Sequence, residues 1–558
     1  MDIQTLLFAF VLLGATAALS WPLGRMMAGA MDPAASGRMT RLFQGIGGRM
    51  ARSDQDWKRY VLAMLAFNVV MFGTVFAVQA LQPWLPLNPD GMGPVRPDLM
   101  FHTAASFTTN TNLQHYSGES TYSHLTQIVG LMWLQFVSAA TGIAALAALA
   151  RGLAGRAMGN FFVDVQRATF LVLLPLALVT AVLLVLTGVP MTFQGAAVVT
   201  TLEGVQQTIA RGPVAAFVAI KQLGTNGGGF FGPNSTHPFE NPTFWSNLIQ
   251  MAAILLIPMA CVWMFARLIG RMRHGAVIFA VMAAFLLVKA AGALYFESAP
   301  TAAFADLAIA QDVGNLEGKE LRLGAATGPL WAVITTATSN GSVGAMHDSL
   351  NPLTGLMPMI GMWLGETFGG VGVGMINMFL YIILGVFVAG MMIGRTPEYL
   401  GWRVEAKEVK LALFALLAHG AFILGGTAIF AATPWGMDAL NNAGPHGFSE
   451  ILYEFSSAAA NNGSGFEGLG DNTVPWNVAT GLVMLLGRFI PIILPLAIVG
   501  SLAAKRRAQE SPGTLSVEGG VFAAMLGVTV IVVGALTFFP AATLGPIADH
   551  LTAIDTYR

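Results

Sequence analysis

Four short segments centred on asparagine carry the residue types in this chain that are best suited to chemistry. We number them in chain order as the first to fourth polar segments: Thr109–Asn112, Thr225–Gly228, Ser339–Ser342 and Asn461–Ser464. Each follows a moderately apolar stretch that is long enough for two or three helical turns. The alignment that we adopt places in register Asn110, Asn226, Asn340 and Asn462. At roughly 115 to 120 residues, this spacing predicts a fourfold internal repeat.

The asparagine-glycine pairs in these segments have a common alternative explanation. Asn-Gly is the strongest short signal for a hairpin turn, so one such pair between apolar stretches would usually be a plain turn. Recurrence in register four times favours a shared role instead. Loops without fixed charge suit a monovalent cation, because backbone carbonyl oxygens can replace its hydration water. The candidate ion ligands are Thr109, Asn110, Thr111, Asn112, Gln114, Thr225, Asn226, Gly227, Gly228, Ser339, Asn340, Gly341, Ser342, Asn461, Asn462, Gly463 and Ser464.

Glycine and helix ends explain how carbonyl groups could face an ion in these segments. Gly227, Gly341 and Gly463 can adopt a positive φ, which lets successive carbonyl oxygens point in one direction. The preceding half-helices would end at the polar segments, so the negative ends of their dipoles would favour a cation there. Thr111 takes the glycine position of the first segment, and we expect a different local geometry in that segment.

The composition requires a membrane environment. Of the 558 residues, 55% are hydrophobic and only 10% are charged. Soluble proteins carry about 25% charged residues, so too few polar side chains remain to cover a water-exposed surface. A soluble enzyme, a disordered scaffold and a nucleic-acid-binding protein are therefore excluded, and a formal net charge of −1 gives no reason to expect a polyanionic partner. We expect an all-α polytopic protein that contacts membrane lipid.

Stretches of about 20 apolar residues predict ten transmembrane helices. Their ranges are approximately 3–23, 60–82, 125–150, 168–189, 245–270, 275–296, 354–393, 409–432, 476–503 and 519–540. An even number places both chain ends on one side of the membrane, and basic residues gather in the connections on the opposite, cytoplasmic side. We expect both termini on the outer, periplasmic side. The outer loops are rich in Asp and Glu, which form either an acidic vestibule or an ordinary solvated surface.

The polar segments divide the chain into four units, each with a helix, a re-entrant half-helix, a polar loop and a second helix. Non-helical backbone survives at membrane depth only where it is buried in protein or lines a water-filled passage, so four such loops indicate a single pore. One extra helix remains at each end. The expected divisions are 1–59 (first helix and cytoplasmic loop), 60–151 (filter 109–114), 167–273 (filter 224–229), 274–395 (filter 338–343), 408–507 (filter 461–465) and 518–558 (last helix).

Two features inside the apolar spans are further candidates. Arg488 falls about ten residues into its helix, near mid-membrane, where we expect it to brace the pore or to repel a second cation. The span 354–393 is roughly twice the usual length. Its glycines, Gly369 and Gly370 among them, predict a break in the helix.

Longer motifs in the sequence are similar to those of one family. Gly224–Phe231, followed by His237–Thr243, closely resembles the potassium-transporting ATPase A subunit family, KdpA, within the superfamily of potassium transporters. The same likeness holds for Thr109–Asn112, Ser339–Val343 with His347–Ser349, and Gly394–Gly401. It covers essentially the whole chain. The resemblance implies four helix-pore helix-helix units around one pore.

The resemblance also implies a function and partners. It indicates the potassium-binding and potassium-translocating subunit of a bacterial inner-membrane complex that imports K⁺ at the expense of ATP. In such a complex a P-type ATPase subunit, KdpB, hydrolyses ATP, and KdpC and KdpF complete the assembly. The sequence has neither a Gly-x-x-x-x-Gly-Lys-Ser/Thr phosphate loop nor an Asp-Lys-Thr-Gly phosphorylation site, so we expect ATP chemistry on a partner and no catalytic cofactor here.

Three residue assignments depend on the same resemblance or stay open. Gln114 could line the ion path or simply bond the loop backbone, and the resemblance favours the ion path. The break around Gly369 and Gly370 resembles a gating loop. Arg395, at the end of that span, is either a gate-associated arginine or an ordinary positive-inside anchor.

Two other classes of function remain to be weighed. A passive potassium channel or a Trk-like symporter subunit is the alternative, because the same four-unit fold would serve it. An intramembrane enzyme has less support, since the sequence lacks His-Glu-x-x-His and Gly-x-Ser-x-Gly motifs. The nine histidines also do not cluster at ligand spacing along the chain.

Overall fold

The computed structural model describes residues 3–32, 37–300, 308, 311–365, 367–507 and 516–556. Within these residues, ten helical spans are long and apolar enough to cross a membrane, which confirms the number predicted from hydropathy. They are formed by α1 (Ile3–Met31), α3 (Trp57–Leu81), α6 (Trp133–Leu153), α7 (Phe161–Arg167) with α8 (Leu174–Leu186), α10 (Phe244–Ile269), α11 (Met272–Ser298), α14 (Val373–Ile393), α15 (Ala406–Ala431), α18 (Val474–Ala503) and α19 (Gly520–Leu544). The chain is therefore a multi-pass membrane protein.

Two of these spans contain a wider helical turn. A π-helical segment, Thr126–Met132, leads into α6, and another, Ala168–Leu173, joins α7 to α8. The expected break in the long span 354–393 is also present. The span is divided into α13 (Pro352–Leu364) and α14, and the described residues between them, 365 and 367–372, are not helical.

A short helix precedes each of the four polar segments. These helices are α4 (Pro97–Thr108), α9 (Val214–Leu223), α12 (Gly324–Ala337) and α17 (Gly444–Ala460). Each lies between two long spans, with at most one residue between its end and the start of its polar segment. The order of long helix, short helix, polar segment and long helix thus occurs four times along the described chain.

The remaining elements are short or peripheral. The helical ones are α2 (Gly37–Ile46), α5 (Gly118–Thr121), α16 (Pro434–Met437), α20 (Pro546–Thr556) and single turns at Gly48–Ala51, Gln82–Trp84, Asn234–Thr236 and Leu321–Leu323. Two antiparallel hairpins supply the strands of the described residues: β1 (Ala197–Thr200) with β2 (Gln206–Ile209), and β3 (Glu398–Tyr399) with β4 (Trp402–Arg403). Ala197 lies opposite Ile209 in the longer hairpin. The all-α class predicted for the membrane part holds.

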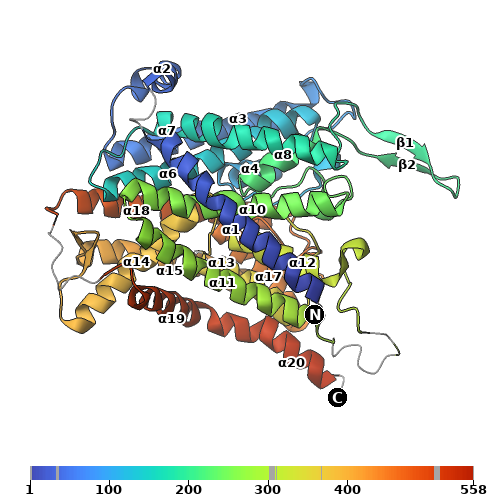
Figure 1. Ribbon diagram of the computed structural model, residues 1–558. Helices are drawn as coiled ribbons and strands as arrows, with labels where there is room; N and C mark the ends of the chain where they lie inside the picture. Colours follow the sequence, from blue (N-terminus) through green and yellow to red (C-terminus); the bar gives the residue numbers. More distant parts are fainter. Residues whose placement is uncertain are drawn as a thin grey trace.

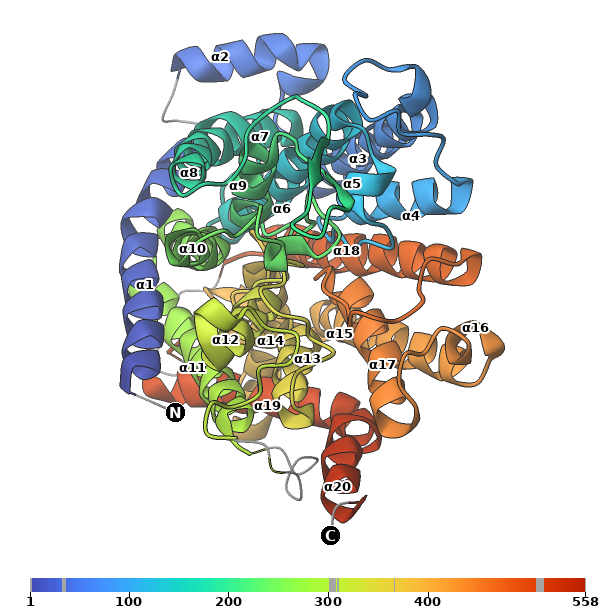
Figure 2. The same ribbon diagram turned by 90° about the vertical axis from the view of Figure 1, so that its right-hand side faces the viewer.

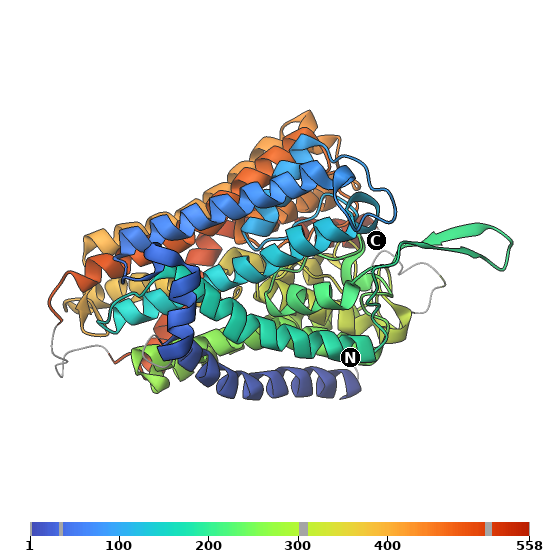
Figure 3. The ribbon, with the colours of Figure 1, turned by 90° about the horizontal axis from the view of Figure 1, so that it is seen from above.

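The long helices run roughly side by side through the length of the molecule (Figure 1). Helix α1 begins, and α20 ends, at the end of the molecule from which the β1–β2 hairpin projects (Figures 1 and 3). Seen from that end, α4, α9, α12 and α17 follow one another in chain order around the middle of the molecule (Figure 2). The four short helices therefore surround a common centre.

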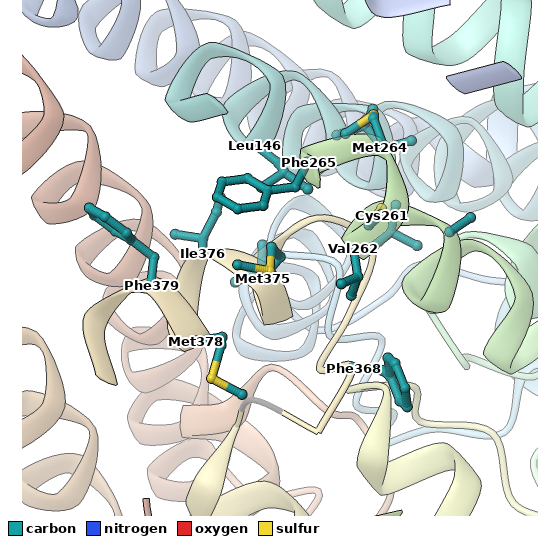
Figure 4. Packing of buried hydrophobic residues seen from close by; sticks show 14 of the residues in the cluster. Leu146, Cys261, Val262, Met264, Phe265, Phe368, Met375, Ile376, Met378 and Phe379 are labelled. Carbon is teal, nitrogen blue, oxygen red and sulfur yellow. The ribbon is translucent and has the colours of Figure 1, made fainter. Parts of the chain in front are cut away.

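The main hydrophobic core contains residues of α6, α10 and α14 and reaches the break between α13 and α14. In Figure 4, Leu146 of α6, Cys261 and Phe265 of α10, and Met375 and Ile376 of α14 lie close together, and all five are buried. The same picture places Phe368, from the broken stretch, at the edge of this cluster. Small side chains along α6 allow close approach, as is usual between membrane helices. This packing positions the break directly against α6.

Candidate functional site

The four polar segments meet around one centre, as contacts at their glycines show. A methyl group added to Gly227 would overlap the backbone of Gly341, and one added to Gly341 would lie 2.6 Å from the carbonyl carbon of Gly463. A methyl group on Gly463 would overlap the carbonyl oxygen of Thr111. The ring closes because a methyl group on Gly228 would lie 2.8 Å from the Cβ of Asn112. Each segment thus touches the next at backbone distance.

Asparagine side chains link neighbouring segments by hydrogen bonds. Asn110 Nδ2 donates to the carbonyl oxygens of Gly224 and Thr225, both at 3.1 Å. Asn462 Nδ2 donates to the carbonyl oxygen of Asn340 at 3.0 Å, and Asn461 Nδ2 donates to Thr111 Oγ1 at 2.9 Å. The second and third segments are joined through the backbone by Gly341 N–H and the carbonyl oxygen of Asn226, at 3.4 Å. These bonds connect all four segments.

The backbone pattern corrects the alignment of the first segment by one residue. The amide N–H of Thr111 donates to the carbonyl oxygen five residues earlier in the chain, at 2.9 Å. Three residues make the same bond, at 2.8 to 3.0 Å: Asn226, Asn340 and Asn462. Thr111, and not Asn110, is therefore their structural equivalent. The sequence alignment was wrong there because it matched residue names, whereas the hydrogen bond follows the end of the helix.

A left-handed residue ends each half-helix and explains why asparagine and small polar residues are placed there. Asn110 has φ 63°, and its equivalents have φ 48°, 46° and 52°: Thr225, Ser339 and Asn461. Only glycine adopts this conformation freely, and asparagine tolerates it better than most other residues. Asn112, with φ 55°, takes the position that Gly227 and Gly463 hold in their segments. We expected an unusual backbone geometry at Thr111. The positive φ angles of the first segment instead occur at the residues on either side of it, Asn110 and Asn112.

The three ring glycines are required for two different reasons. Gly227 has φ 87° and Gly463 has φ 102°, as expected for positions that need a left-handed backbone. Gly341 is not among the residues with positive φ, so the expectation is wrong for that position. Its glycine is required by close approach, because an added Cβ would lie 2.8 Å from the Cα of Gly463.

Two cavities lie on opposite sides of the ring. The first, which we call the Gln114 chamber, has a volume of about 410 Å³, and its wall includes Gln114, Gly341 and Gly463. The second, the Arg488 chamber, has a volume of about 50 Å³ and is lined by Ser339, Asn461, Gly369, Gly370 and Arg488 among others. Residues of the third and fourth polar segments therefore face both chambers, and the ring separates them.

The break between α13 and α14 lies against the ring. The amide N–H of Val371 donates to Thr225 Oγ1 at 3.0 Å, and a methyl group on Gly370 would lie 3.5 Å from the Cβ of Ser339. On the opposite side, a side chain at Gly372 would overlap the backbone of Gly142 in α6, and a side chain at Gly142 would overlap the carbonyl oxygen of Val371. Residues 370–372 of the break are therefore held between α6 and the polar segments.

The two candidate arginines have different surroundings. Arg488 is buried in α18, borders the Arg488 chamber and donates from Nη2 to the carbonyl oxygen of Ser138 at 3.2 Å. Arg395 is exposed just beyond the end of α14, which at 1.5 Å per residue separates it from the break by about 30 Å. The structure thus brings Arg488, Gly369 and Gly370 to the ring and leaves Arg395 apart.

Gln114 bonds the loop backbone, which is one of the two roles that the sequence left open, and it also borders a cavity. Its Nε2 donates to the carbonyl oxygen of Gly229 at 3.0 Å, and its Oε1 accepts from the amide N–H of Gly229 at 2.7 Å. The side chain also borders the Gln114 chamber. Gln114 therefore fixes the loop after the second polar segment while it faces the cavity.

A buried ion pair between Lys221 and Glu240 lies behind the second segment and was not predicted from the sequence. Lys221 Nζ and Glu240 Oε2 are paired, and both side chains are fully buried. Glu240 Oε1 accepts from the amide N–H groups of Phe230 and Phe231 at 2.6 and 3.0 Å. Lys221 Nζ also bonds Asn234, whose Nδ2 donates to the carbonyl oxygen of Gly227 at 2.7 Å. The one sequence feature that could have indicated this ion pair is the charge of Lys221 inside the otherwise apolar helix α9.

Polar residues of α6 also support the ring and were not predicted. Ser138 Oγ donates to Asn110 Oδ1 at 2.8 Å, and Asn226 Nδ2 donates to Ser138 Oγ at 3.2 Å. Gln135 Nε2 donates to Asn112 Oδ1 at 3.2 Å. The spacing of Gln135 and Ser138 by three residues in an apolar helix places both on one face, which could have indicated a polar neighbour.

Acidic side chains border the Gln114 chamber, in agreement with a vestibule. Glu467 and Asp471 line it. Burial raises the pKa of Glu467 to about 8, although the carboxylate accepts from the amide N–H of His347 at 2.6 Å. Burial also raises the pKa of Asp471, an effect that the nearby His115 opposes. Glu203, by contrast, is exposed at the tip of the β1–β2 hairpin, where the solvated-surface interpretation holds.

Comparison with known proteins gives one family. A sequence model described as potassium-transporting ATPase A subunit matches residues 10–551. The chain is 48% identical over 563 aligned positions to the potassium-transporting ATPase potassium-binding subunit of Rhodospirillum centenum, covering 99% of this chain and 98% of that protein. It is 49% identical to the protein of the same name in Mesorhizobium japonicum, with coverage of 99% and 98%. The corresponding protein of Pseudomonas entomophila is 51% identical, with coverage of 91% and 90%.

A match over nearly the full length, with relatives at about half identity, agrees with the multi-pass membrane fold. The chain belongs to the potassium-transporting ATPase A subunit family.

Proposed function

We propose that this chain is the potassium-binding, ion-selecting subunit of an ATP-driven K⁺ import complex, and that the ring of polar segments is its selectivity filter. The observation that carries the proposal is the closed ring itself, in which four non-helical segments meet between two cavities. Non-helical backbone inside a membrane protein is tolerated where it lines a passage for water or ions. The names of the relatives, each a potassium-binding subunit, indicate which ion is bound.

The chemistry of the ring suits K⁺. Of its candidate ligands, none is charged, so oxygen dipoles rather than carboxylates would replace the water of the ion, which favours a monovalent cation. The half-helices α4, α9, α12 and α17 all end at the ring, and their partial negative charges favour a cation at its centre. The bonds between asparagines and carbonyl groups hold the ring at a fixed size, so an ion of a different radius is bound less well.

The fourfold order of elements supports division of the chain into four homologous units. In this proposal the units are 60–151, 167–273, 274–395 and 408–507, with 1–59 and 518–558 as additions at the two ends. The repeated hydrogen bond to the carbonyl five residues earlier is the local feature that the units share. The break at 365–372 gives the third unit a gate beneath the filter, a role supported by its contacts with Thr225 and Ser339.

Orientation and partners follow from charge and from the family. The connections rich in Lys and Arg would face the cytoplasm of a bacterium, which places the Gln114 chamber and both termini on the periplasmic side of the inner membrane. K⁺ would then enter through the chamber that carries Glu467 and Asp471. The ATP would be used by a P-type partner, KdpB, and KdpC and KdpF would complete the complex.

The first test separates a pump subunit from a passive channel or symporter. If this chain is tagged and purified from cells that express the whole complex, we expect it to bring an ATPase with it, and we expect K⁺ to stimulate ATP hydrolysis. The same chain alone should hydrolyse no ATP. Purification without an ATPase, together with K⁺ flux in liposomes containing only this chain, would instead support the passive alternative.

The second test addresses the filter. Gly227→Ala and Gly463→Ala place a methyl group against the neighbouring segment, so we expect the carbonyl ring to distort and the preference for K⁺ over Rb⁺ and Na⁺ to fall at least tenfold. The measurement is ion competition in the ATPase assay of the complex. Gly270→Ala is the matched control, because Gly270 also has a positive φ (74°) but has no atom of another residue within 4 Å of the added group. Unchanged selectivity in the ring variants would remove these glycines from the filter.

The third test concerns Arg488. The guanidinium group of Arg488 lines the same chamber as Ser339 and Asn461 of the ring, and its positive charge would repel a cation bound there. Arg488→Gln should therefore tighten the apparent binding of K⁺ by about tenfold while the complex still assembles, and Arg488→Lys, which keeps the charge, should bind K⁺ nearly as the native chain does. The K⁺ concentration for half-maximal ATPase stimulation gives the comparison. If the glutamine variant assembles with native affinity, the charge does not act on the bound ion.

The fourth test concerns the ion pair behind the second segment. Lys221→Met leaves the Glu240 carboxylate buried and unpaired, so we expect a loss of about 3–5 kcal/mol in stability and weaker discrimination against Na⁺, because the loop that holds Gly227 loses its support. Lys319→Met is the matched control. Its pair with Glu297, at 2.7 Å, is equally buried, but neither residue contacts the ring. Equal effects of the two variants on ion preference would show that Lys221 has no specific role at the filter.

A further inference from the structure

A cluster of metal-ligating side chains lies on the wall of the Gln114 chamber, outside the ring. His115 comes from the loop after the first polar segment, Glu454 from α17, and Asp471 from the loop after the fourth segment. His115 Nε2 is 3.0 Å from Glu454 Oε1 and 3.7 Å from Asp471 Oδ2. The side chains of His115 and Glu454 are buried, and that of Asp471 is 24% exposed. The cluster is thus closed on the protein side and open to the chamber.

The orientation of Asn477 determines which nitrogen of His115 carries a proton. Asn477 Nδ2 donates to Asp98 Oδ2 at 2.8 Å and to Asn472 Oδ1 at 3.3 Å, so the amide oxygen of Asn477 faces His115. That oxygen lies 2.7 Å from His115 Nδ1 and can only accept, so Nδ1 carries the hydrogen. In the neutral ring, Nε2 therefore presents its lone pair toward two carboxylates. Either a second ring proton or a bound cation would satisfy this arrangement.

The distances fit a divalent transition metal. Zn²⁺ binds nitrogen and carboxylate oxygen at about 2.0–2.2 Å, which in a tetrahedral site places the ligand atoms about 3.3–3.6 Å apart. The two distances from Nε2 lie on either side of this range. Metal-bound histidines usually donate their other ring N–H to an oxygen acceptor, as His115 does to Asn477. We propose that His115, Glu454 and Asp471 bind a divalent transition-metal ion of the Zn²⁺ class beside the ring.

A second histidine supports the site without being a ligand. His102 is fully buried, stacks on His115 with ring centroids 3.8 Å apart, and has no protein hydrogen-bond partner at either nitrogen among the described residues. A charged ring there would repel a charged His115. With a metal bound at Nε2, His115 keeps only the proton on Nδ1. The stacked ring of His102 then holds the imidazole plane of His115 so that Nε2 faces the carboxylates.

The other histidine cluster of the described chain provides a contrast. His446 is 2.9 Å from Asp348 Oδ1 through Nε2 and 2.9 Å from Asp549 Oδ2 through Nδ1. Glu450, the third residue of that cluster, accepts from the amide N–H groups of Asn441 and Asn442, both at 2.9 Å. Both ring nitrogens of His446 are occupied as donors to carboxylates, so no lone pair is left for a metal. His446→Asn is therefore a suitable control.

The test is a titration of the purified full-length chain with Co²⁺, whose visible absorption is intense in tetrahedral sites, followed by competition with Zn²⁺. We expect one saturable site in the native chain and in His446→Asn. His115→Phe should lose the site. Asp471→Asn, at a partly exposed position that tolerates the change, should weaken Co²⁺ binding at least tenfold even if the histidine variant does not fold.

Two results would overturn the proposal. One is a native chain that shows no protein-dependent Co²⁺ band, which would leave His115 as an imidazolium paired with two carboxylates only. The other is native Co²⁺ affinity in both His115→Phe and Asp471→Asn, which would place any bound metal elsewhere. Because the readout is metal binding and not transport, neither result depends on the proposed K⁺ function.

Discussion

The structure depends on how the backbone of four non-helical segments is satisfied inside an apolar molecule. Once a half-helix ends, its last carbonyl groups and the following amide groups have no helical partners, and leaving them unpaired away from water is costly. Here the neighbouring segment supplies the partners: Asn110 bonds the carbonyl oxygens of Gly224 and Thr225, and Asn462 bonds that of Asn340. No segment is complete without the next one. The ring is therefore a single unit of structure rather than four independent loops.

The four segments of the ring are not equivalent. They differ in the residues that pack behind them. The second segment has the strongest support, because the buried pair of Lys221 and Glu240 holds the following loop and Asn234 bonds the carbonyl oxygen of Gly227. The third segment lies against the break at 365–372. A stretch of backbone that is held by α6 on one side and by Thr225 on the other can change the ring if it moves. The ion pair supports the second segment, and the proposed gate lies against the third.

Hydropathy and helix-end signals were enough to predict much of this fold. The ten apolar spans, the break in the long span and the ends of the half-helices were predicted from local sequence and are confirmed. The alignment of Asn110 was wrong because equivalent positions are defined by a backbone hydrogen bond, which residue identity does not report. The pairing of His115 with Glu454 joins residues more than 300 positions apart, and a search for nearby histidines along the chain had no means of finding it.

Charge is distributed unequally on the two sides of the uncharged ring. The Gln114 chamber carries the carboxyl groups of Glu467 and Asp471, whereas the Arg488 chamber carries a guanidinium group. The two approaches to the ring are therefore electrostatically different for a cation, because only the Arg488 chamber carries a fixed positive charge. Arg488 also donates to the backbone of Ser138, the residue whose hydroxyl group donates to Asn110 and accepts from Asn226. The guanidinium group is thus linked through Ser138 to the first and second polar segments, so displacement of Arg488 would alter the electric field and the ring geometry together.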